Sequence, residues 1–351
     1  MPPTPTETDA LVVGAGPVGL YQAFQLGLLG LTVQIVDARP EAGGQCTALY
    51  ADKPIYDLPG LPRITGRELV EQLQAQLAPL RPPLQLGVEV TALQRRPDDR
   101  FDILASDGVP RVAAAAFIAA GVGAFQPRRL RVAGLETLEG RQVFHHPHDL
   151  APFAGRRVVV VGGDEAALAC AAALVARGDI AAVTLMHRRD ALQGEPDLLD
   201  RIAGLRADGR LACVAARVQA ARIDGSSAAD GRLAHLDVLD ADGATHALAL
   251  DALIVCQGLS PRLGPLADWG LAMARKLLQV DAATLQTSEP GIHAVGDICT
   301  YAGKLKLIVC GFHEATLAAH AAHARLRPHE HGPLLYTTSS ALLQQRLGVR
   351  P

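Results

Sequence analysis

Two stretches of the chain share one pattern of hydrophobic and polar positions. In residues 10–38, a short apolar run, a glycine-rich turn, a longer apolar segment and a second short apolar run follow one another. Residues 156–189 repeat this order later in the chain. Short apolar runs between turn residues predict buried strands, and longer ones predict helices. The chain therefore predicts an α/β fold with two strand-turn-helix-strand units.

Two further stretches, residues 91–108 and 220–248, alternate apolar and polar residues around Asp-Gly turns. This pattern predicts antiparallel hairpins that extend each sheet. We place the first domain boundary in the Arg- and Gly-rich stretch between the two units. The motif PGIHAVGD and the Ala-rich helix after it have no place in the second sheet. We therefore expect a discontinuous first domain, 1–128 with 281–351, and an inserted second domain, 129–280.

The first turn carries a dinucleotide-binding motif. Gly14, Gly16 and Gly19 stand in the spacing Gly-x-Gly-x-x-Gly, with Pro17 among them, between a predicted strand and a predicted helix. The first glycine permits the tight turn, the second lets the backbone approach a pyrophosphate, and the third lets the helix pack on the strand. Asp37 ends the second strand, where a carboxylate accepts hydrogen bonds from an adenosine ribose. We predict Rossmann-like dinucleotide-binding domains, and the turn alone fits both NAD and FAD.

The segments that decide between these dinucleotides are residues 38–62 and 287–315. Together they resemble the flavoprotein disulfide-reductase superfamily, in which each domain has the three-layer ββα form. In that superfamily the pair that corresponds to Gly296 and Asp297 reaches the ribityl and phosphate region of the flavin. The helix that follows points its N-terminus at the isoalloxazine, where a positive dipole end stabilises electron density on the reduced flavin.

Within that superfamily the chain resembles the thioredoxin-reductase-like ferredoxin–NADP reductases, which are single-chain, dimeric FAD enzymes of bacteria. The most specific segments of this resemblance are residues 43–62, 253–271, 296–315 and 334–340. It implies that the discontinuous domain binds FAD, that the inserted domain binds NADPH, and that the protein is a homodimer. The FAD contacts that it implies are Asp37, Gln45, Tyr50, Val90, Phe125, Gly296, Asp297, Tyr336 and Thr338.

Two of these contacts are tyrosines. Tyr50 matches the family tyrosine that stacks on the flavin ring, and Tyr336 falls where the family's C-terminal extension places a ring. In the family that extension crosses to the partner subunit, so we expect residues 330–351 to form a lid. A lid of this kind controls access to the hydride-accepting face of the flavin. An ordinary surface or interface aromatic is the alternative interpretation of Tyr336.

The sequence offers no dithiol that could carry electrons away from the flavin. Thioredoxin reductases have a Cys-x-x-Cys just ahead of the second dinucleotide strand, whereas residues 143–157 contain no cysteine and the six cysteines of the chain never take that spacing. Electrons must then leave singly, or as hydride from the flavin edge, which favours ferredoxin or flavodoxin as the partner. We expect no catalytic acid or base, because flavin N5 accepts the hydride directly.

Three histidines, His145, His146 and His148, occupy this same segment. Imidazoles so close in sequence bind adventitious metal. No carboxylate or cysteine accompanies them at helical ligand spacing, and Pro147 interrupts regular structure, so we predict no metal site.

The second turn departs from the family pattern at its third glycine. Gly162 and Gly163 are followed by Asp164, which places a carboxylate where an NADPH pyrophosphate would lie. Such a charge costs about 1 to 4 kcal/mol at surface-like dielectric unless it turns into solvent. This substitution predicts a weakened second dinucleotide site.

Basic residues favour NADPH over NADH at this site. His187, Arg188 and Arg189 follow the second strand of the unit, where arginines hold a 2′-phosphate. A further arginine of the family is replaced by Gln193. We therefore expect weak NADPH binding, with a solvated charge run as the alternative interpretation of the basic residues.

Composition narrows the possible functions. The 351 residues carry a net charge of −3, with 49% hydrophobic and 20% charged residues, which is ordinary for a soluble two-domain protein. The chain has no block of basic residues of the kind that binds nucleic acid. No apolar stretch is long enough to span a membrane, and the N-terminus lacks the features of a secretory signal. We expect a cytoplasmic protein.

The leading hypothesis is an FAD-dependent oxidoreductase that transfers electrons between NADPH and ferredoxin or flavodoxin. Two alternatives stay open. The first is a flavin-binding protein with an impaired or lost NADPH site, which Asp164 and Gln193 motivate. The second is an NAD(P)H-dependent reductase of quinones or other small acceptors, which any accessible flavin supports.

Overall fold

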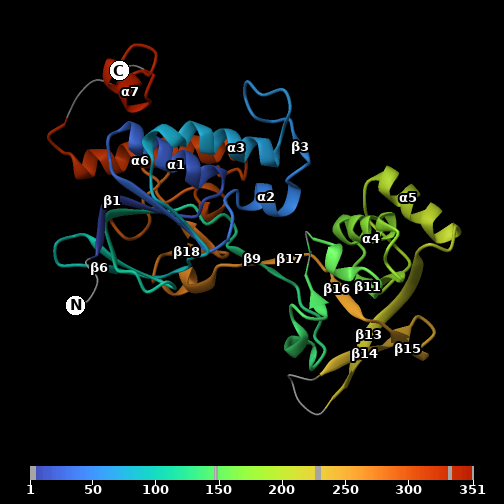
Figure 1. Cartoon of the computed structure of the whole chain (residues 1–351). Coiled ribbons are helices and arrows are strands. Elements are labelled where there is room, and N and C mark those ends of the chain that lie inside the picture. The colour runs from blue at the N-terminus through green and yellow to red at the C-terminus, as the bar shows by residue number, and fades with distance from the viewer. Residues whose placement is uncertain (1–4, 146, 148, 226–230, 331–333, 350–351) are drawn as a thin grey trace. The chain divides into compact units, whose positions relative to one another are not determined.

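The structure is a computed structural model and describes residues 5–145, 147, 149–225, 231–330 and 334–349. The chain divides into two compact units (Figure 1). The first unit is formed by Met1–Ala124 and Pro261–Pro351, and the second by Phe125–Ser260.

The first unit is built on a sheet with the strand order β5-β2-β1-β8-β7-β6, and β20 also pairs with β8. Parallel pairing joins β5, β2, β1, β8 and β20, whereas β6 and β7 are antiparallel additions. The strands are β1 (Thr6–Val13), β2 (Val33–Asp37), β5 (Leu84–Leu86), β6 (Val90–Arg95), β7 (Phe101–Ala105), β8 (Arg111–Ile118) and β20 (Ile292–Ala294).

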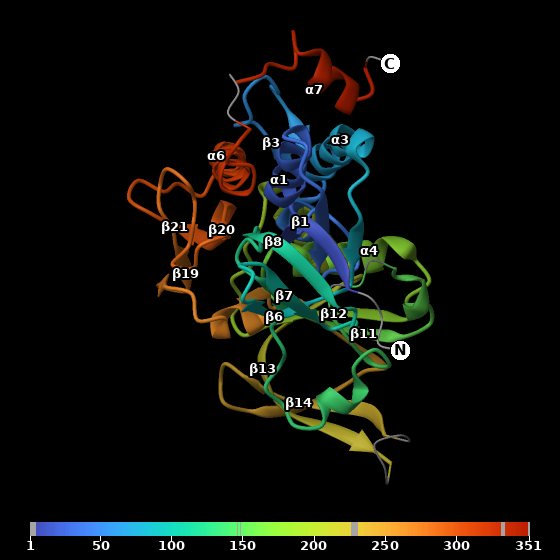
Figure 2. The same cartoon turned by 90° about the vertical axis from the view of Figure 1, so that its left-hand side faces the viewer.

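Helices α1, α3 and α6 lie side by side over one face of this sheet (Figures 1 and 2). Helix α1 begins with Pro17, and α3 begins with a capping box between Thr65 and Glu68. The helices are α1 (Pro17–Leu28), α2 (Gln45–Tyr50), α3 (Gly66–Leu77), α6 (Ile308–Leu326) and α7 (Ala341–Arg346), with 3-10 turns η1 (Ala78–Leu80), η4 (Gly264–Asp268) and η5 (Gly296–Ile298). The remaining short strands are β3 (Pro54–Ile55), β4 (Ile64–Thr65), β18 (Met273–Ala274), β19 (Leu277–Gln279) and β21 (Cys299–Thr300).

Strand β1 is buried on both faces because successive side chains point to opposite sides of a sheet. Ala10 and Val12 belong to the large core under the helices. Leu11 belongs to a smaller core on the other face, with Ile103 of β7. The apolar run of the sequence thus fills two cores at once, as expected for a central parallel strand.

The second unit has a sheet with the strand order β10-β16-β11-β12-β13-β14-β15. The first five strands are parallel, and β13, β14 and β15 form an antiparallel meander. The strands are β10 (Val143–Phe144), β11 (Arg157–Val161), β12 (Ala182–His187), β13 (Ala212–Asp224), β14 (Arg232–Asp240), β15 (Thr245–Ala249) and β16 (Ala252–Val255). The helices are α4 (Glu165–Arg177) and α5 (Pro196–Ala207), with 3-10 turns η2 (Leu135–Leu138) and η3 (Ala151–Phe153). Strands β9 (Ala124–Pro127) and β17 (Leu259–Arg262) pair with each other where the chain passes between the units.

The predicted α/β fold with two Rossmann-like, three-layer units is confirmed, as are the antiparallel additions to each sheet. The expected return to the first unit at residue 281 is wrong, because the chain returns at Pro261. Trp269 donates a hydrogen bond from Nε1 to the Thr91 carbonyl at 3.1 Å, and β19 pairs with β21 at Leu278 and Cys299. These long-range contacts fix residues 261–280 to the first unit. No helix within the described ranges is long and apolar enough to cross a membrane.

His293 is an uncharged histidine in the core of the first unit. It lies in β20 with 1% of its surface exposed, and its ring stacks on Phe117 with centroids 5.1 Å apart. Nδ1 donates to the Thr284 carbonyl at 2.9 Å, and burial lowers the pKa of His293 from 6.5 to about 4. As the pH falls, the unfolded chain takes up a proton at this side chain near pH 6.5, whereas the folded chain does so only near pH 4. The contribution of His293 to the stability of the fold is therefore complete above pH 6.5 and is lost as the pH falls toward 4.

We expect His293→Phe to weaken the acid sensitivity of the fold. In the parent, protonation of this side chain in the unfolded state lowers the free energy of unfolding by about 2 to 3 kcal/mol between pH 7 and pH 4.5. Phenylalanine keeps the ring stacking without the titration. Urea unfolding of both proteins at the two pH values measures the difference, and equal losses of stability would contradict the assignment.

Candidate functional site

Close packing requires glycine at two positions of the first turn. Gly14 has φ +111°, and a Cβ there would lie 2.5 Å from the Ala119 carbonyl oxygen. A Cβ on Gly19 would lie 1.9 Å from the Gly14 carbonyl oxygen. Both separations are too short for any side chain. These glycines bring the start of α1 against the ends of β1 and β8.

The remaining glycine of the motif leaves open space at the helix terminus. A Cβ on Gly16 would meet only the Cα of Gly44, at 3.9 Å, and a Cβ on Gly44 would lie 3.2 Å from the Cα of Gly16. Gly16 is the N-cap of α1. Within the described residues, no side chain caps this helix, and its first turn contains no acidic residue. Helix N–H groups without acceptors bind phosphate, so this cradle of bare backbone fits a pyrophosphate.

Asp37 lies directly behind this turn. Its Oδ2 accepts the Ala15 N–H at 2.6 Å, and its Oδ1 accepts the Arg39 N–H at 2.7 Å. Burial raises the pKa of Asp37, and the two backbone hydrogen bonds oppose that rise. The carboxylate is thus held at the end of β2 beside the glycine turn, where a ribose-binding residue belongs.

Gln45 and Asp297 meet although they are far apart in the sequence. Gln45 at the start of α2 donates from Nε2 to Asp297 Oδ2 at 3.1 Å, and Asp297 lies in η5. Gly121 comes close to the same amide, since a Cβ there would lie 3.4 Å from Gln45 Nε2. Tyr50 ends α2 half-buried, its hydroxyl accepts a hydrogen bond from the Cys46 thiol at 3.4 Å, and burial raises the pKa of Tyr50.

Four other residues expected to contact the flavin lie in different environments. Val90 is buried at the start of β6. Phe125 lies in β9, and its side chain is outside the described part of the structure. Tyr336 is 63% exposed, and Thr338 is also exposed. Both precede α7, whose Arg346 donates to the Leu28 carbonyl at the end of α1 in the same chain.

The second turn also requires its glycines. A Cβ on Gly162 would lie 2.0 Å from the Cys256 carbonyl oxygen, and one on Gly163 would lie 2.6 Å from Cγ of His187. His187 thus stands against the turn, and its Nδ1 donates to the Arg189 carbonyl at 2.9 Å. Arg188 and Arg189 are exposed.

The loop after β12 returns to this turn. The backbone N–H of Gln193 donates to the Gly163 carbonyl at 2.8 Å. The loop that follows Arg188 and Arg189 is therefore held against the glycine turn.

Asp164 caps helix α4. Its backbone is extended, with φ −96° and ψ 173°, so the missing glycine causes no strain. Its Oδ1 accepts the Ala167 N–H at 3.1 Å, and Glu165 adds a second acid in the first turn. The carboxylate of Asp164 therefore satisfies a backbone N–H that a pyrophosphate would otherwise bind, whereas α1 has no such side-chain cap.

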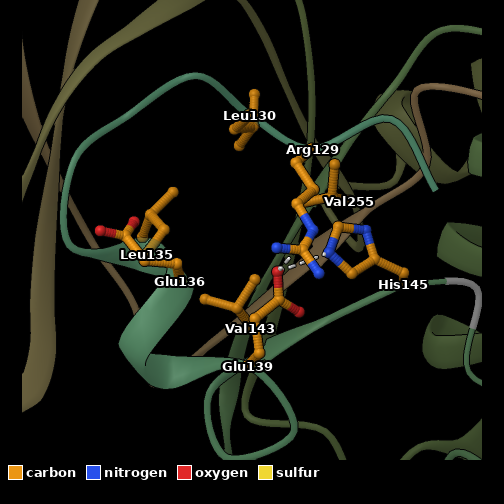
Figure 3. A pocket seen from close by; sticks show the side chains of 8 residues that line it. All are labelled: Arg129, Leu130, Leu135, Glu136, Glu139, Val143, His145 and Val255. Atoms are coloured by element: carbon orange, nitrogen blue, oxygen red, sulfur yellow. Dashed lines mark hydrogen bonds and ion pairs between the residues drawn. The ribbon is translucent and has the colours of Figure 1, made fainter. Parts of the chain in front are cut away.

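A small pocket in the second unit is lined by none of the predicted contact residues (Figure 3). Its lining includes Glu139, whose Oε1 lies 3.1 Å from His145 Nε2 and 3.7 Å from Arg129 Nε. Figure 3 shows the arginine and the histidine pointing toward this carboxylate. His146 and His148 lie outside the described residues, and the described ones contain no group of three or more side chains that could hold a metal ion.

A family model described as pyridine nucleotide-disulphide oxidoreductase matches residues 8–324. The chain belongs to this family. Among similar members, the ferredoxin–NADP reductase of Verminephrobacter eiseniae (strain EF01-2) is 52% identical over 347 residues, which cover 98% of each chain. The ferredoxin–NADP reductase of Paracidovorax citrulli (strain AAC00-1) is 53% identical over 352 residues, which cover 98% of this chain and 96% of that protein. The predicted resemblance is confirmed.

Solved structures show the same family fold. The thioredoxin reductase of T. acidophilum matches with a TM-score of 0.63 and 22% identity over 91% of this chain and 99% of that one. The bacillithiol disulfide reductase Bdr of Staphylococcus aureus matches with a TM-score of 0.65 and 15% identity over 91% and 99%. At these identities the likeness shows the fold alone.

Two residues that the sequence motifs did not single out, Glu314 and Lys304, form an ion pair next to the Gly296 turn. A signal was present, because Glu314 stands on the face of an Ala-rich helix that is otherwise apolar, with Gly311, Ala315 and Ala318. A charge at a predicted core position calls for a partner.

We expect Asp164→Ala to lower the free energy of unfolding of the second unit by about 1 kcal/mol, because alanine cannot cap α4. Asp164→Asn should stay within a few tenths of a kcal/mol of the parent, since asparagine caps equally well. Urea unfolding compares the three proteins. An alanine variant as stable as the asparagine variant would show that the cap contributes nothing.

Proposed function

We propose that this chain is an FAD-dependent oxidoreductase of the ferredoxin–NADP(+) reductase type, which transfers electrons between NADPH and ferredoxin or flavodoxin. The carrying observation is the first turn, where an uncapped helix N-terminus faces a backbone cradle beside Asp37 and the Gln45–Asp297 pair. Support also comes from relatives named ferredoxin–NADP reductase that share about half of the residues over nearly the whole chain.

The first unit is the proposed FAD-binding domain. The N–H groups at the start of α1 bind the pyrophosphate, Asp37 accepts hydrogen bonds from the adenosine ribose, and Asp297 contacts the ribityl region. Tyr50 stacks on the flavin ring. When bound, FAD accepts a hydride and passes electrons on singly, so the chain supplies orientation and exclusion of water rather than an acid or base. The full set of proposed contacts is Gly14, Gly16, Pro17, Gly19, Asp37, Gln45, Tyr50, Val90, Phe125, Gly296, Asp297, Tyr336 and Thr338.

The second unit is the proposed NADPH-binding domain. The backbone at Gly162 and Gly163 approaches the pyrophosphate, and His187, Arg188 and Arg189 hold the 2′-phosphate. Asp164 keeps this binding weak, because its carboxylate places a negative charge at the helix terminus where the pyrophosphate would lie.

The proposed acceptor is a one-electron carrier. The sequence has no Cys-x-x-Cys, so the thiolate attack by which a dithiol passes electrons to a disulfide is not available. One NADPH then gives a hydride to the enzyme, and two carriers take one electron each, with release of a proton.

The proposed assembly is a cytoplasmic homodimer in which the C-terminal segment covers the partner's cofactor. Leu334, Leu335 and Tyr336 support this, because they are 60%, 46% and 63% exposed in the single chain.

A second candidate is a flavin-binding protein that no longer uses NADPH. The observation that favours it is the cap of Asp164 on α4. Reduction of the bound flavin by a donor other than NADPH would then be the physiological route.

The test is anaerobic reduction of ferredoxin by the FAD-loaded protein with saturating NADPH. We expect two ferredoxins reduced for each NADPH oxidised. The matched control is Gly16→Val, whose Cβ would meet only the Cα of Gly44, at 3.9 Å, while the side chain fills the pyrophosphate cradle. It should fold and yet lose FAD and activity. Absence of ferredoxin reduction by the FAD-loaded parent would contradict the proposal.

A further inference from the structure

A buried ion pair lies next to the proposed flavin contacts without belonging to them. Glu314 in α6 and Lys304 in the loop before that helix have 1% and 5% of their side chains exposed. Lys304 Nζ lies 2.5 Å from Glu314 Oε1. Burying two charges is costly unless further hydrogen bonds satisfy them, so such a pair calls for an explanation.

Both oxygens of Glu314 are occupied. Oε1 also accepts the Tyr301 hydroxyl at 2.7 Å. Oε2 accepts the backbone N–H of Gly296 at 2.8 Å and lies 3.6 Å from the Cys299 thiol. The four partners of this carboxylate are Lys304, Tyr301, Gly296 and Cys299. Three of them lie in residues 296–301, so Glu314 contacts the segment that follows β20 at three points.

The Gly296 turn depends on that carboxylate. Strand β20 ends at Ala294, Val295 still donates to the Ile118 carbonyl, and Gly296 then takes φ +78°. From there its buried N–H reaches a side chain instead of a strand. The next residue, Asp297, accepts the Gln45 amide at 3.1 Å. A continuous chain of contacts thus runs from Glu314 through Gly296 and Asp297 to Gln45.

We propose that Glu314, with its charge balanced by Lys304, is the positioning residue of the FAD site, because it holds the Gly296–Asp297 turn in its cofactor-binding form. This rests on the proposed binding of FAD by the first unit. Glu314 acts through the backbone N–H of Gly296, and Lys304 balances its carboxylate, so that Glu314 adds no net negative charge next to Asp297.

Two charge-neutral double variants isolate this role. Glu314→Gln with Lys304→Met keeps an acceptor oxygen for Gly296, whereas Glu314→Met with Lys304→Met removes the acceptor at similar volume. Replacing a buried ion pair by apolar residues of similar volume is often neutral or stabilising. A merely structural pair therefore predicts that both variants bind FAD like the parent.

The measurement is the FAD dissociation constant of each apoprotein, from quenching of flavin fluorescence. We expect the glutamine variant to stay within about threefold of the parent, and the methionine variant to bind about ten- to a hundredfold more weakly, because the Gly296 N–H is left unsatisfied. Urea unfolding of the apoproteins gives the stability of each for comparison.

The matched control is the ion pair between the buried Arg111 and the partly exposed Asp107, whose side chains are 0% and 25% exposed. Arg111 begins β8, at the opposite end of that strand from Ala119 and the glycine turn. Arg111→Met with Asp107→Asn should change stability without changing the FAD dissociation constant.

Equal FAD affinity in the methionine and glutamine variants would overturn the proposal, as would an equal loss of affinity in the control. A parent apoprotein that binds no FAD would overturn the proposed function as well. Should the methionine variant not fold, amide hydrogen exchange of the FAD-loaded parent decides, since the proposal requires the Gly296 N–H to exchange slowly. Exchange at the rate of an unstructured peptide would contradict it.

Discussion

The first N–H groups of an α-helix have no acceptor within the helix, so they attract an anion unless a side chain satisfies them. The two glycine turns of this protein differ in this respect. At α1 the N-cap is Gly16, which has no side chain, and no acid follows in the first turn. At α4 the N-cap is Asp164, whose carboxylate accepts the Ala167 N–H. Two turns of similar design thus differ in whether their helix dipole is open to a ligand.

Apart from the caps, the two turns are built alike, because in each one close packing at the end of the sheet holds the glycines in place. Gly14 and Gly19 lock the first turn against β8, and Gly162 and Gly163 lock the second against Cys256 and His187. Parallel pairing of β20 with β8 then brings Asp297 beside Gln45. A residue late in the sequence thereby joins a site that the first unit begins to build at its N-terminus.

Local patterns were sufficient to predict the two strand-turn-helix-strand units, the glycine turns and the added hairpins, since each is decided by residues close together in the sequence. The return of the chain to the first unit was placed too late, because Trp269 and Leu278 are fixed by partners far away in the sequence. The pairing of Lys304 could not be predicted for a related reason. It stands in a loop beside the exposed Leu305, and only the fold turns its amino group inward to Glu314.

Asp164 shows how one residue supports two interpretations. Measured against a family motif it is a lost glycine, whereas measured against helix chemistry it is a good N-cap. The comparison with the motif predicts a weaker second site. The structure shows that the residue in question is an anionic N-cap, which brings a negative charge to the start of α4.

The central claim is therefore that the charge of Asp164 limits binding at the second turn. It is tested most directly by titrating the FAD-loaded protein with NADP⁺, which carries the phosphates of NADPH without reducing the flavin. Asp164→Asn keeps the cap and removes the charge, so we expect about tenfold tighter binding. The matched control is Asp197→Asn, which makes the same charge change in the first turn of α5. An affinity that is unchanged by Asp164→Asn, or changed equally by both variants, would contradict the account.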